Sequence, residues 1–186
     1  MYRVNNDQVV ELAKLPKPES GAPSPQVFAT EHTIWLTYFI SESDPWYEKK
    51  YSKIWSDSDE QCKEDCFAVV QFKTAHIHMF GGPSEETIVG HPLAERGLES
   101  FRIGENTNST WIKELEEMDS LGHSRQACGF LGARHFILAF HDSTFECIAQ
   151  RFNVYIRHGD MLEEVGKILR AFDDGLEVPV SLEKSE

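Results

Sequence analysis

Hydrophobic and polar residues alternate most regularly over residues 134–157, where two runs of β-branched and aromatic residues flank the polar stretch His-Asp-Ser-Thr at 141–144. Such runs around a short polar break predict a β-hairpin. Whether the turn takes two residues or four, Phe140 is expected to face Phe145 on the partner strand. The alternation places a set of apolar side chains on one face of the hairpin, which should meet the core: Phe136, Leu138, Phe140, Phe145, Cys147 and Ala149.

The opposite face of the hairpin carries polar side chains that suggest chemistry. In this register, Glu146 is expected to lie opposite Ala139 and diagonal to His141, within reach of a long side chain. Asp142 lies in the turn beside them. These residues therefore form a candidate general acid–base or metal site, with Glu146 and Asp142 as the catalytic carboxylates. The alternative is that Asp142 is an ordinary turn former, and that His141 and Glu146 make a surface pair worth less than about 1 kcal/mol.

The remaining periodicity predicts an α+β fold, with a mainly antiparallel β-sheet covered by two or three helices. Besides the hairpin, strands are expected over residues 33–41, 66–80 and 99–105. Apolar residues at helical spacing predict helices over residues 108–121 and 161–173. Two weaker amphipathic patterns predict short helices within residues 1–15 and 45–56.

Proline and glycine divide the chain into three expected parts. Residues 16–25 contain four prolines and a glycine, a composition typical of an extended connector. Residues 1–32 are therefore expected to form an N-terminal arm and Pro-rich connector, 33–175 a single α+β domain, and 176–186 a polar C-terminal tail.

Charge narrows the range of partners. The chain has 186 residues, with 31 Asp and Glu against 18 Lys and Arg, which gives a net charge of −13 at pH 7. This balance argues against a nucleic-acid backbone or an anionic membrane as the main partner and favours a basic protein. No apolar run has the position of a signal peptide or the length of a membrane span. The four cysteines are expected to be reduced thiols, which fits a cytoplasmic location.

The positions of several histidines suggest a metal-binding site. His78 lies on a predicted strand, His91 is held extended by the proline that follows it, and His141 lies at the hairpin turn. With Asp142 or Glu146 added, these three histidines would suit zinc or non-haem iron. A structural variant would use a different set of ligands, Cys62, Cys66, His76 and His78. The sequence contains no dinucleotide- or phosphate-binding motif and no Gly-x-Ser-x-Gly motif.

Three stretches carry a resemblance to other sequences. They are Gly-His-Pro-Leu at 90–93, Asn-Ser-Thr-Trp at 108–111 and Phe-His-Asp-Ser-Thr-Phe-Glu-Cys at 140–147. Over about residues 33–157 the chain resembles a family of uncharacterised bacterial proteins with no assigned activity. The resemblance implies a bacterial-type protein and transfers no catalytic role. It makes the stretches around His91 and around residues 141–146 the ones to test.

Two functions stay open on this basis, beside a third possibility, a structural domain with a shallow pocket lined by aromatic side chains. The first is a small acidic intracellular binding module, without enzymatic activity, that engages a basic protein as toxin-neutralising immunity proteins do. Its support is the charge, the size and the lack of a catalytic signature. The alternative is a metal-assisted hydrolase, in which His78, His91 and His141 bind the metal and Glu146 acts as general base.

Overall fold

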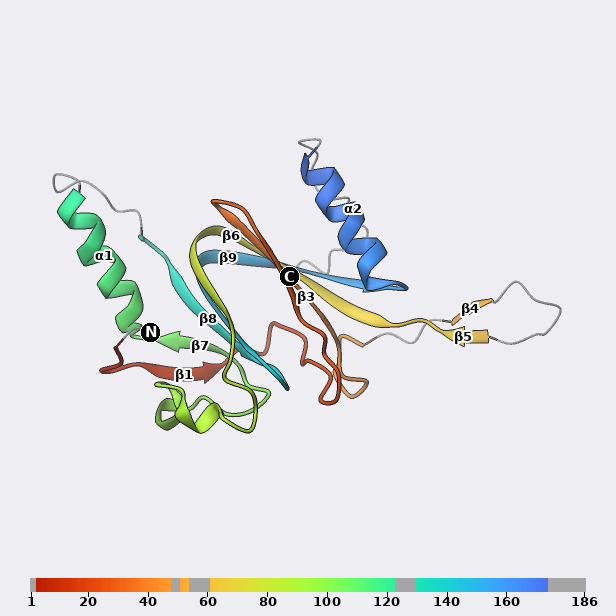
Figure 1. Cartoon of the computed structure of the whole chain (residues 1–186), viewed down its shortest axis with the longest axis horizontal. Helices are drawn as coiled ribbons and strands as arrows, with labels where there is room; N and C mark the ends of the chain where they lie inside the picture. Colours follow the sequence, from red (N-terminus) through yellow and green to blue (C-terminus); the bar gives the residue numbers. More distant parts are fainter. Residues whose placement is uncertain (1–2, 48–50, 54–60, 123–129, 174–186) are drawn as a thin grey trace. The chain divides into compact units, whose positions relative to one another are not determined.

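The computed structural model describes residues 3–47, 51–53, 61–122 and 130–173. These residues form the following strands in chain order: β1 (Gln8–Glu11), β2 (Gln26–Ala29), β3 (Thr33–Phe39), β4 (Tyr51–Lys53), β5 (Gln61–Lys63), β6 (Cys66–Gly81), β7 (Ile103–Thr107), β8 (Arg134–Ala139) and β9 (Thr144–His158). The α-helices are α1 (Thr110–Gly122) and α2 (Met161–Asp173), and two short 3-10 helices precede β7, η1 (Ile88–Gly90) and η2 (Ala94–Arg96) (Figure 1).

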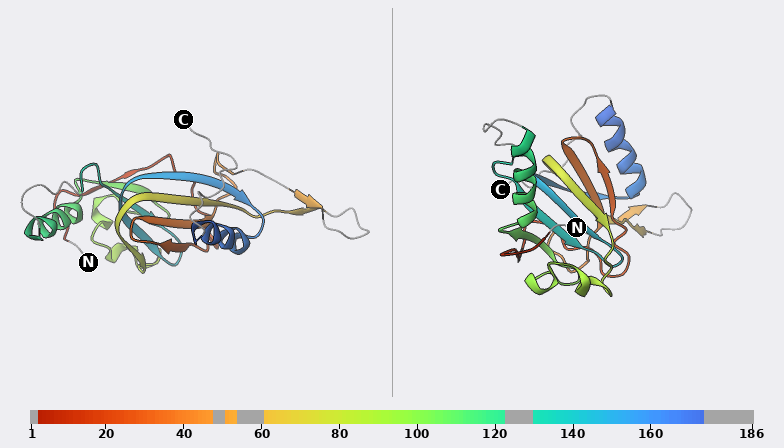
Figure 2. Two further views of the ribbon diagram at one scale, coloured as in Figure 1. Left: turned by 90° about the horizontal axis from the view of Figure 1, so that it is seen from above. Right: turned by 60° about the vertical axis from the view of Figure 1, so that its left-hand side comes forward.

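Seven of these strands form one antiparallel sheet in the order β1-β7-β8-β9-β6-β3-β2, and β4 pairs separately with β5. A fold built mostly from an antiparallel sheet with two helices agrees with the expected α+β class. Figure 2 shows the two helices, α1 in green and α2 in blue. That helices cover the sheet stays a prediction, as do the expected domain boundaries. Within the described residues, no helix is both long and apolar enough to cross a membrane.

Most of the predicted elements are confirmed. The strands expected over 33–41 and 66–80 are β3 and β6, the hairpin is β8 with β9, and the two strong helical patterns are α1 and α2. The third strand begins at Ile103 rather than at residue 99. The preceding residues form a turn in which the Arg102 N–H donates to the Glu99 carbonyl at 3.1 Å, and Phe101 has a positive φ of 57°.

The helix expected within residues 1–15 is wrong, because β1 is a strand that pairs with β7. Val9 is buried at 6% exposure and its neighbour Val10 is 43% exposed, so the side chains alternate with the period of a strand. Gly104 on β7 permits this pairing, because a Cβ atom there would lie 2.6 Å from Val9 Cγ1. A long-range pairing therefore overrides the local amphipathic pattern.

The helix expected within residues 45–56 is also wrong for the part that the structure describes. Tyr51–Lys53 forms β4, which pairs with β5. Asp44 does not begin a helix but organises a turn: its carboxylate accepts hydrogen bonds from the N–H groups of Trp46 at 2.8 Å and Lys17 at 2.9 Å. Residues 48–50 and 54–56 of the expected helix lie outside the described residues.

The β8–β9 hairpin loop has four residues, one of the two expected lengths, but it begins one residue earlier than predicted. Leu138 lies opposite Phe145, where Phe140 was predicted, so the register differs from the prediction by two residues. Residues 140–143 form the loop, which closes with a hydrogen bond of 2.7 Å from the Phe140 N–H to the Ser143 carbonyl.

A shift of two residues leaves every side chain on its predicted face. The apolar face is accordingly confirmed, because Phe136 and Phe145 both lie against the ring of Phe72, with centroids 5.3 and 5.5 Å away. On the other face the shift changes the neighbours, and Glu146 lies opposite Ile137 instead of Ala139. This change decides which histidine Glu146 meets.

Contacts within the chain define two compact units. The first comprises residues 1–15, 29–34 and 72–152. Its apolar core gathers side chains from β1, from the segment that holds η1 and η2, from α1 and from the hairpin: Val9, Ile88, Leu93, Leu98, Trp111, Ile137, Ala139 and Ile148. The candidate site described below belongs to this unit.

The second unit comprises residues 16–28, 35–71 and 153–186. Its core joins α2 to side chains from β3, β6 and β9: Trp35, Phe67, Val69, Tyr155, Met161, Val165 and Ile168. The three α2 residues in this list are four and three positions apart, so the amphipathic pattern expected for this helix is confirmed.

Candidate functional site

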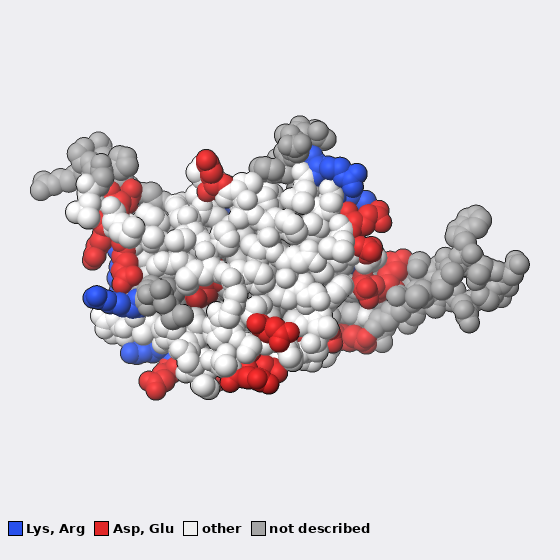
Figure 3. Space-filling model, viewed as in Figure 1, with Lys and Arg blue, Asp and Glu red and all other residues white. Residues whose placement is uncertain are grey.

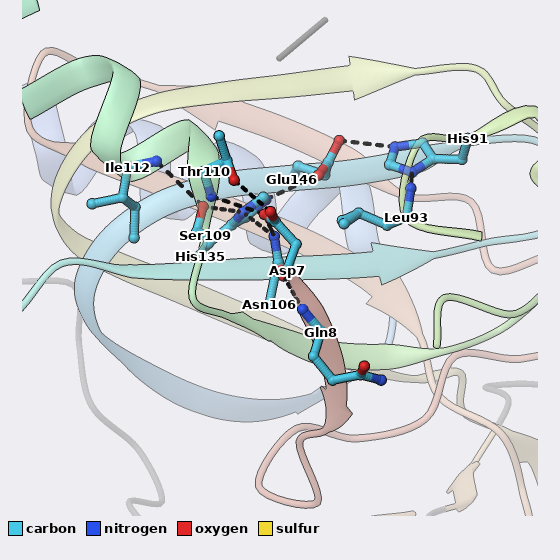
Figure 4. A network of polar contacts seen from close by, with 10 residues as sticks. All are labelled: Asp7, Gln8, His91, Leu93, Asn106, Ser109, Thr110, Ile112, His135 and Glu146. Carbon is cyan, nitrogen blue, oxygen red and sulfur yellow. Dashed lines mark hydrogen bonds and ion pairs between the residues drawn. The ribbon is translucent and has the colours of Figure 1, made fainter. Parts of the chain in front are cut away.

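Glu146 on β9 is the centre of a buried polar network in the first unit (Figure 4). Its Oε1 atom lies 3.1 Å from His91 Nε2, and its Oε2 atom lies 2.9 Å from His135 Nε2. The three side chains are 4%, 2% and 0% exposed, respectively. Each carboxylate oxygen thus meets one imidazole inside the protein.

The other ring nitrogens determine which tautomers are present. His91 Nδ1 accepts the Leu93 N–H at 3.2 Å, so its Nε2 is the nitrogen that carries the proton. His135 Nδ1 lies 3.0 Å from Asn106 Nδ2, which can only donate, so its Nε2 also carries the proton. From these partners we assign two neutral imidazoles that donate to one ionised carboxylate.

Three segments place these groups. The hairpin register puts Ile148 opposite His135 and Ile137 opposite Glu146, so His135 and Glu146 are diagonal neighbours on one face. His91 follows η1 with extended backbone angles (φ −72°, ψ 140°), as the following proline predicts. His91 and Glu146 are 55 positions apart in the sequence, so only the tertiary structure brings them together.

Asp7 extends the polar network to the N-terminal segment. Its carboxylate accepts hydrogen bonds of 2.9 Å from the N–H of Asn5, from Asn106 Nδ2 and from the N–H of Thr110, and a further one from the Thr110 hydroxyl. Burial, the largest single influence, raises the pKa of Asp7, but these hydrogen bonds together lower it to about 2. Asp7 thereby joins the segment before β1 to the start of α1.

Ser109 links the same network to the beginning of α1. Its Oγ atom lies 2.9 Å from His135 Nδ1 and accepts the Ile112 N–H at 3.3 Å, as an N-cap residue does. Asn108, immediately before it, has a positive φ of 57°, a conformation that asparagine tolerates better than most residues. The turn between β7 and α1 thus points the Ser109 hydroxyl at the buried histidine.

His141 lies elsewhere, at the exposed end of the hairpin. Its Nδ1 atom is 2.8 Å from Asp142 Oδ1, and its Nε2 atom is 3.3 Å from Glu85 Oε1. The hydrogen bond with Asp142 is the main cause that raises the pKa of His141, and the negative charges of Asp142, Glu85 and Glu86 add to it. The expected contact between His141 and Glu146 is wrong, because the hairpin register differs by two residues.

The predicted metal ligands are found with different neighbours. His91 binds Glu146, His141 binds Asp142 and Glu85, and the ring of His78 stacks on Phe145 at a centroid distance of 6.5 Å. In the part of the chain that the structure describes, no three His, Cys, Asp or Glu residues are grouped so that they could hold a metal ion. The alternative structural metal site would use Cys62, Cys66, His76 and His78. The side chain of Cys62 lies outside the described part of the chain, and Cys66 is a buried free thiol.

The five predicted site residues do not form one site: His91 meets Glu146 in the buried network, His141 meets Asp142 at the exposed end of the hairpin, and His78 is in neither pair. The prediction missed His135, although the alternation of the first strand already put it on the same face as Glu146. Ser109 and Asp7 were also missed as members of the site. Ser109 contacts a histidine 26 positions away in the sequence, and Asp7 contacts Asn106 and Thr110, which are 99 and 103 positions away. Local sequence patterns give no measure of such distances.

The arrangement of this network is compatible with two roles, one catalytic and one structural. Ser109, His135 and Glu146 are connected in the order hydroxyl, imidazole, carboxylate, which is the order of an acyl-transfer relay. However, the Ser109 hydroxyl already caps α1, and the ring of Trp111 lies edge-on to His135 at 5.2 Å. In this closed arrangement the network holds four separate segments of the first unit together.

Comparisons of the chain with protein-family models, with curated proteins and with solved structures find no match.

Proposed function

We propose that this chain is a non-enzymatic binding module that engages a basic protein partner in the cytoplasm, in the way that an immunity protein engages a toxin. The observation that carries this proposal is the net charge of −13, from 31 acidic and 18 basic residues. An acidic surface attracts a basic partner, speeds its association and discriminates against acidic competitors.

The location of the carboxylates supports the proposal. Among the described Asp and Glu residues, only Asp7, Asp44 and Glu146 are buried. The others whose side chains the structure describes are exposed or half-exposed, so nearly all of the described carboxylates lie where a partner can meet them. Figure 3 shows acidic side chains distributed over the face in view.

The test is capture of a partner by the full chain. Immobilised protein is incubated with bacterial extract at low salt and eluted with a salt gradient, beside an unrelated acidic protein of matched net charge. We expect a basic protein to be retained by this chain and not by the control, and its affinity to weaken at least about tenfold between low and moderate salt. Recovery of the same proteins on both columns would overturn the proposal.

A second candidate function is hydrolysis by a His/carboxylate site, which the connected groups Ser109, His135 and Glu146 favour. The Ser109 oxygen would bond to an acyl carbon while its proton passes to His135 Nδ1 and then to the leaving group, whose bond to that carbon breaks. A water molecule would then give a proton to His135 and cleave the acyl–Ser109 ester, which releases the acid and restores the serine. A fluorophosphonate probe tests this reaction: labelling at Ser109 that is lost in Ser109→Ala supports it, and an unlabelled native chain rules it out. Metal content of protein purified without chelator tests the metal-assisted form.

A further inference from the structure

Helix α1 exposes large apolar side chains to solvent although its inner face is already packed. Trp111 is buried at 7% exposure, and Ile112 and Leu115 pack against the same core cluster. On the outside, Met118 is 67% exposed and Leu121 is 90% exposed. A helix that needs one apolar face to fold therefore carries a second set of apolar residues.

These outer residues form a stripe together with two carboxylates. Glu114, Glu117, Met118 and Leu121 are spaced i, i+3, i+4 and i+7, so they lie along one side of the helix. We call this set the outer stripe. Within the described residues, neither Glu114 nor Glu117 takes part in an ion pair. The charges of the outer stripe are therefore available to a partner.

Helix α2 provides an internal comparison. It also exposes two apolar side chains, Leu162 at 67% and Leu169 at 42%. Two of its carboxylates, however, are paired within the chain, because Lys167 Nζ lies 3.1 Å from Glu163 Oε1 and 2.5 Å from Glu164 Oε1. Exposed apolar residues occur on both helices, and on α1 they accompany Glu114 and Glu117, which form no ion pair among the described residues.

We propose that the outer stripe of α1 is the docking surface for a basic amphipathic segment of the partner. This inference rests on the proposed function and names the surface that performs it. Apolar side chains of such a segment would pack on Met118 and Leu121, and its Lys or Arg residues would pair with Glu114 and Glu117. A flexible methionine suits an interface of this kind because its side chain adapts to the shape of the partner. Figure 3 shows acidic side chains over the position that α1 occupies in Figure 1.

The experiment measures binding of a fluorescent synthetic peptide, with leucine and lysine at helical spacing, to the full chain by anisotropy. One variant removes the apolar part of the outer stripe, Met118→Ser with Leu121→Ser, and another reverses its charge, Glu114→Lys with Glu117→Lys. Both should bind the peptide about tenfold or more weakly than the parent. Because three of the four side chains are solvent-exposed and Glu114 is half-buried, thermal unfolding should be little changed, and it is measured to check folding.

Two matched controls separate this surface from general effects. Leu162→Ser with Leu169→Ser removes the exposed apolar residues of α2, and Glu31→Lys with Glu95→Lys makes the same change of net charge at exposed positions outside the two α-helices. Both controls should bind within about twofold of the parent. Equal weakening by a control, or parental binding by the α1 variants, would overturn the docking surface.

The captured partner distinguishes this inference from the proposed function. If a specific basic protein is captured and binds the α1 variants as tightly as the parent, the docking surface is wrong and the proposed function stands. If the capture yields no specific basic protein, the proposed function itself fails. Sedimentation of the chain alone tests a second copy as occupant: a dimer that Leu121→Ser dissociates would replace the partner segment by self-association.

Discussion

His91 Nε2 lies 3.1 Å from Glu146 Oε1, and both side chains are almost completely buried. This contact ties the segment between η1 and η2 to the first residues of β9. The same carboxylate also binds His135, so one buried charge is shared by two imidazole donors. A buried charge is tolerated only where such donors replace water.

Glu146→Gln should lower the free energy of unfolding by about 2–4 kcal/mol. The amide has one donor and one acceptor group, so one of the two imidazole N–H groups loses its acceptor inside the protein. Urea unfolding followed by tryptophan fluorescence at pH 7 measures the change. His141→Ala, which removes a surface pair, is the control and should change the free energy of unfolding much less than Glu146→Gln does. A Glu146→Gln variant as stable as the control would show that the network does not stabilise the fold.

Asp7 should make the free energy of unfolding depend on pH between about 2 and 3.8. Because hydrogen bonds lower the pKa of Asp7 in the folded chain to about 2 from 3.8, the ionised carboxylate stabilises the folded state. This contribution, about 2 kcal/mol, is fully present above pH 3.8 and is lost as the pH falls towards 2. Unfolding of the parent and of Asp7→Asn should therefore differ most near neutral pH and converge near pH 2. A constant difference across this range would contradict the assignment.

His141 should titrate above the ordinary histidine value. Its hydrogen bond with Asp142, reinforced by nearby Glu85 and Glu86, raises the pKa, so protonated His141 favours the folded hairpin end. The stabilising effect is fully present below the unfolded value of 6.5 and disappears as the pH rises through the raised folded pKa. Proton NMR of the imidazole ring gives the pKa directly, and Asp142→Asn should bring it back towards 6.5. An unchanged value in that variant would exclude Asp142 as the cause.

Gly104→Ala should weaken the pairing of β1 with β7. The added Cβ would lie 2.6 Å from Val9 Cγ1 and 2.9 Å from the Val10 carbonyl oxygen, so the strands must separate, at a cost of about 1–3 kcal/mol. Hydrogen exchange of the β1 amides should become faster in this variant. Gly90→Ala is the matched control, since a Cβ there meets nothing within 4 Å. Unchanged exchange in Gly104→Ala would contradict the strand assignment at Gln8–Glu11.

Local alternation predicted the main strands and the faces of the hairpin. Phe136 and Phe145 lie on the apolar face as expected, and both contact Phe72, because a register shift of two residues leaves the face of every side chain unchanged. The spacing of Met161, Val165 and Ile168 predicted α2 for the same reason, since a helical period follows from the chain itself. In these elements the physical cause is local and can be read in the sequence.

The candidate site depended on the tertiary structure. Whether Glu146 meets His141 or His135 is a matter of register, which the four-residue loop at 140–143 decides. The N-terminal segment is a strand because it pairs with β7, almost a hundred residues away, although its own pattern also fits a helix. The sequence by itself determined which residues are apolar, how they alternate and how negative the chain is. Only the tertiary structure decided which buried charge meets which imidazole, because that choice depends on distances between segments that local periodicity does not specify.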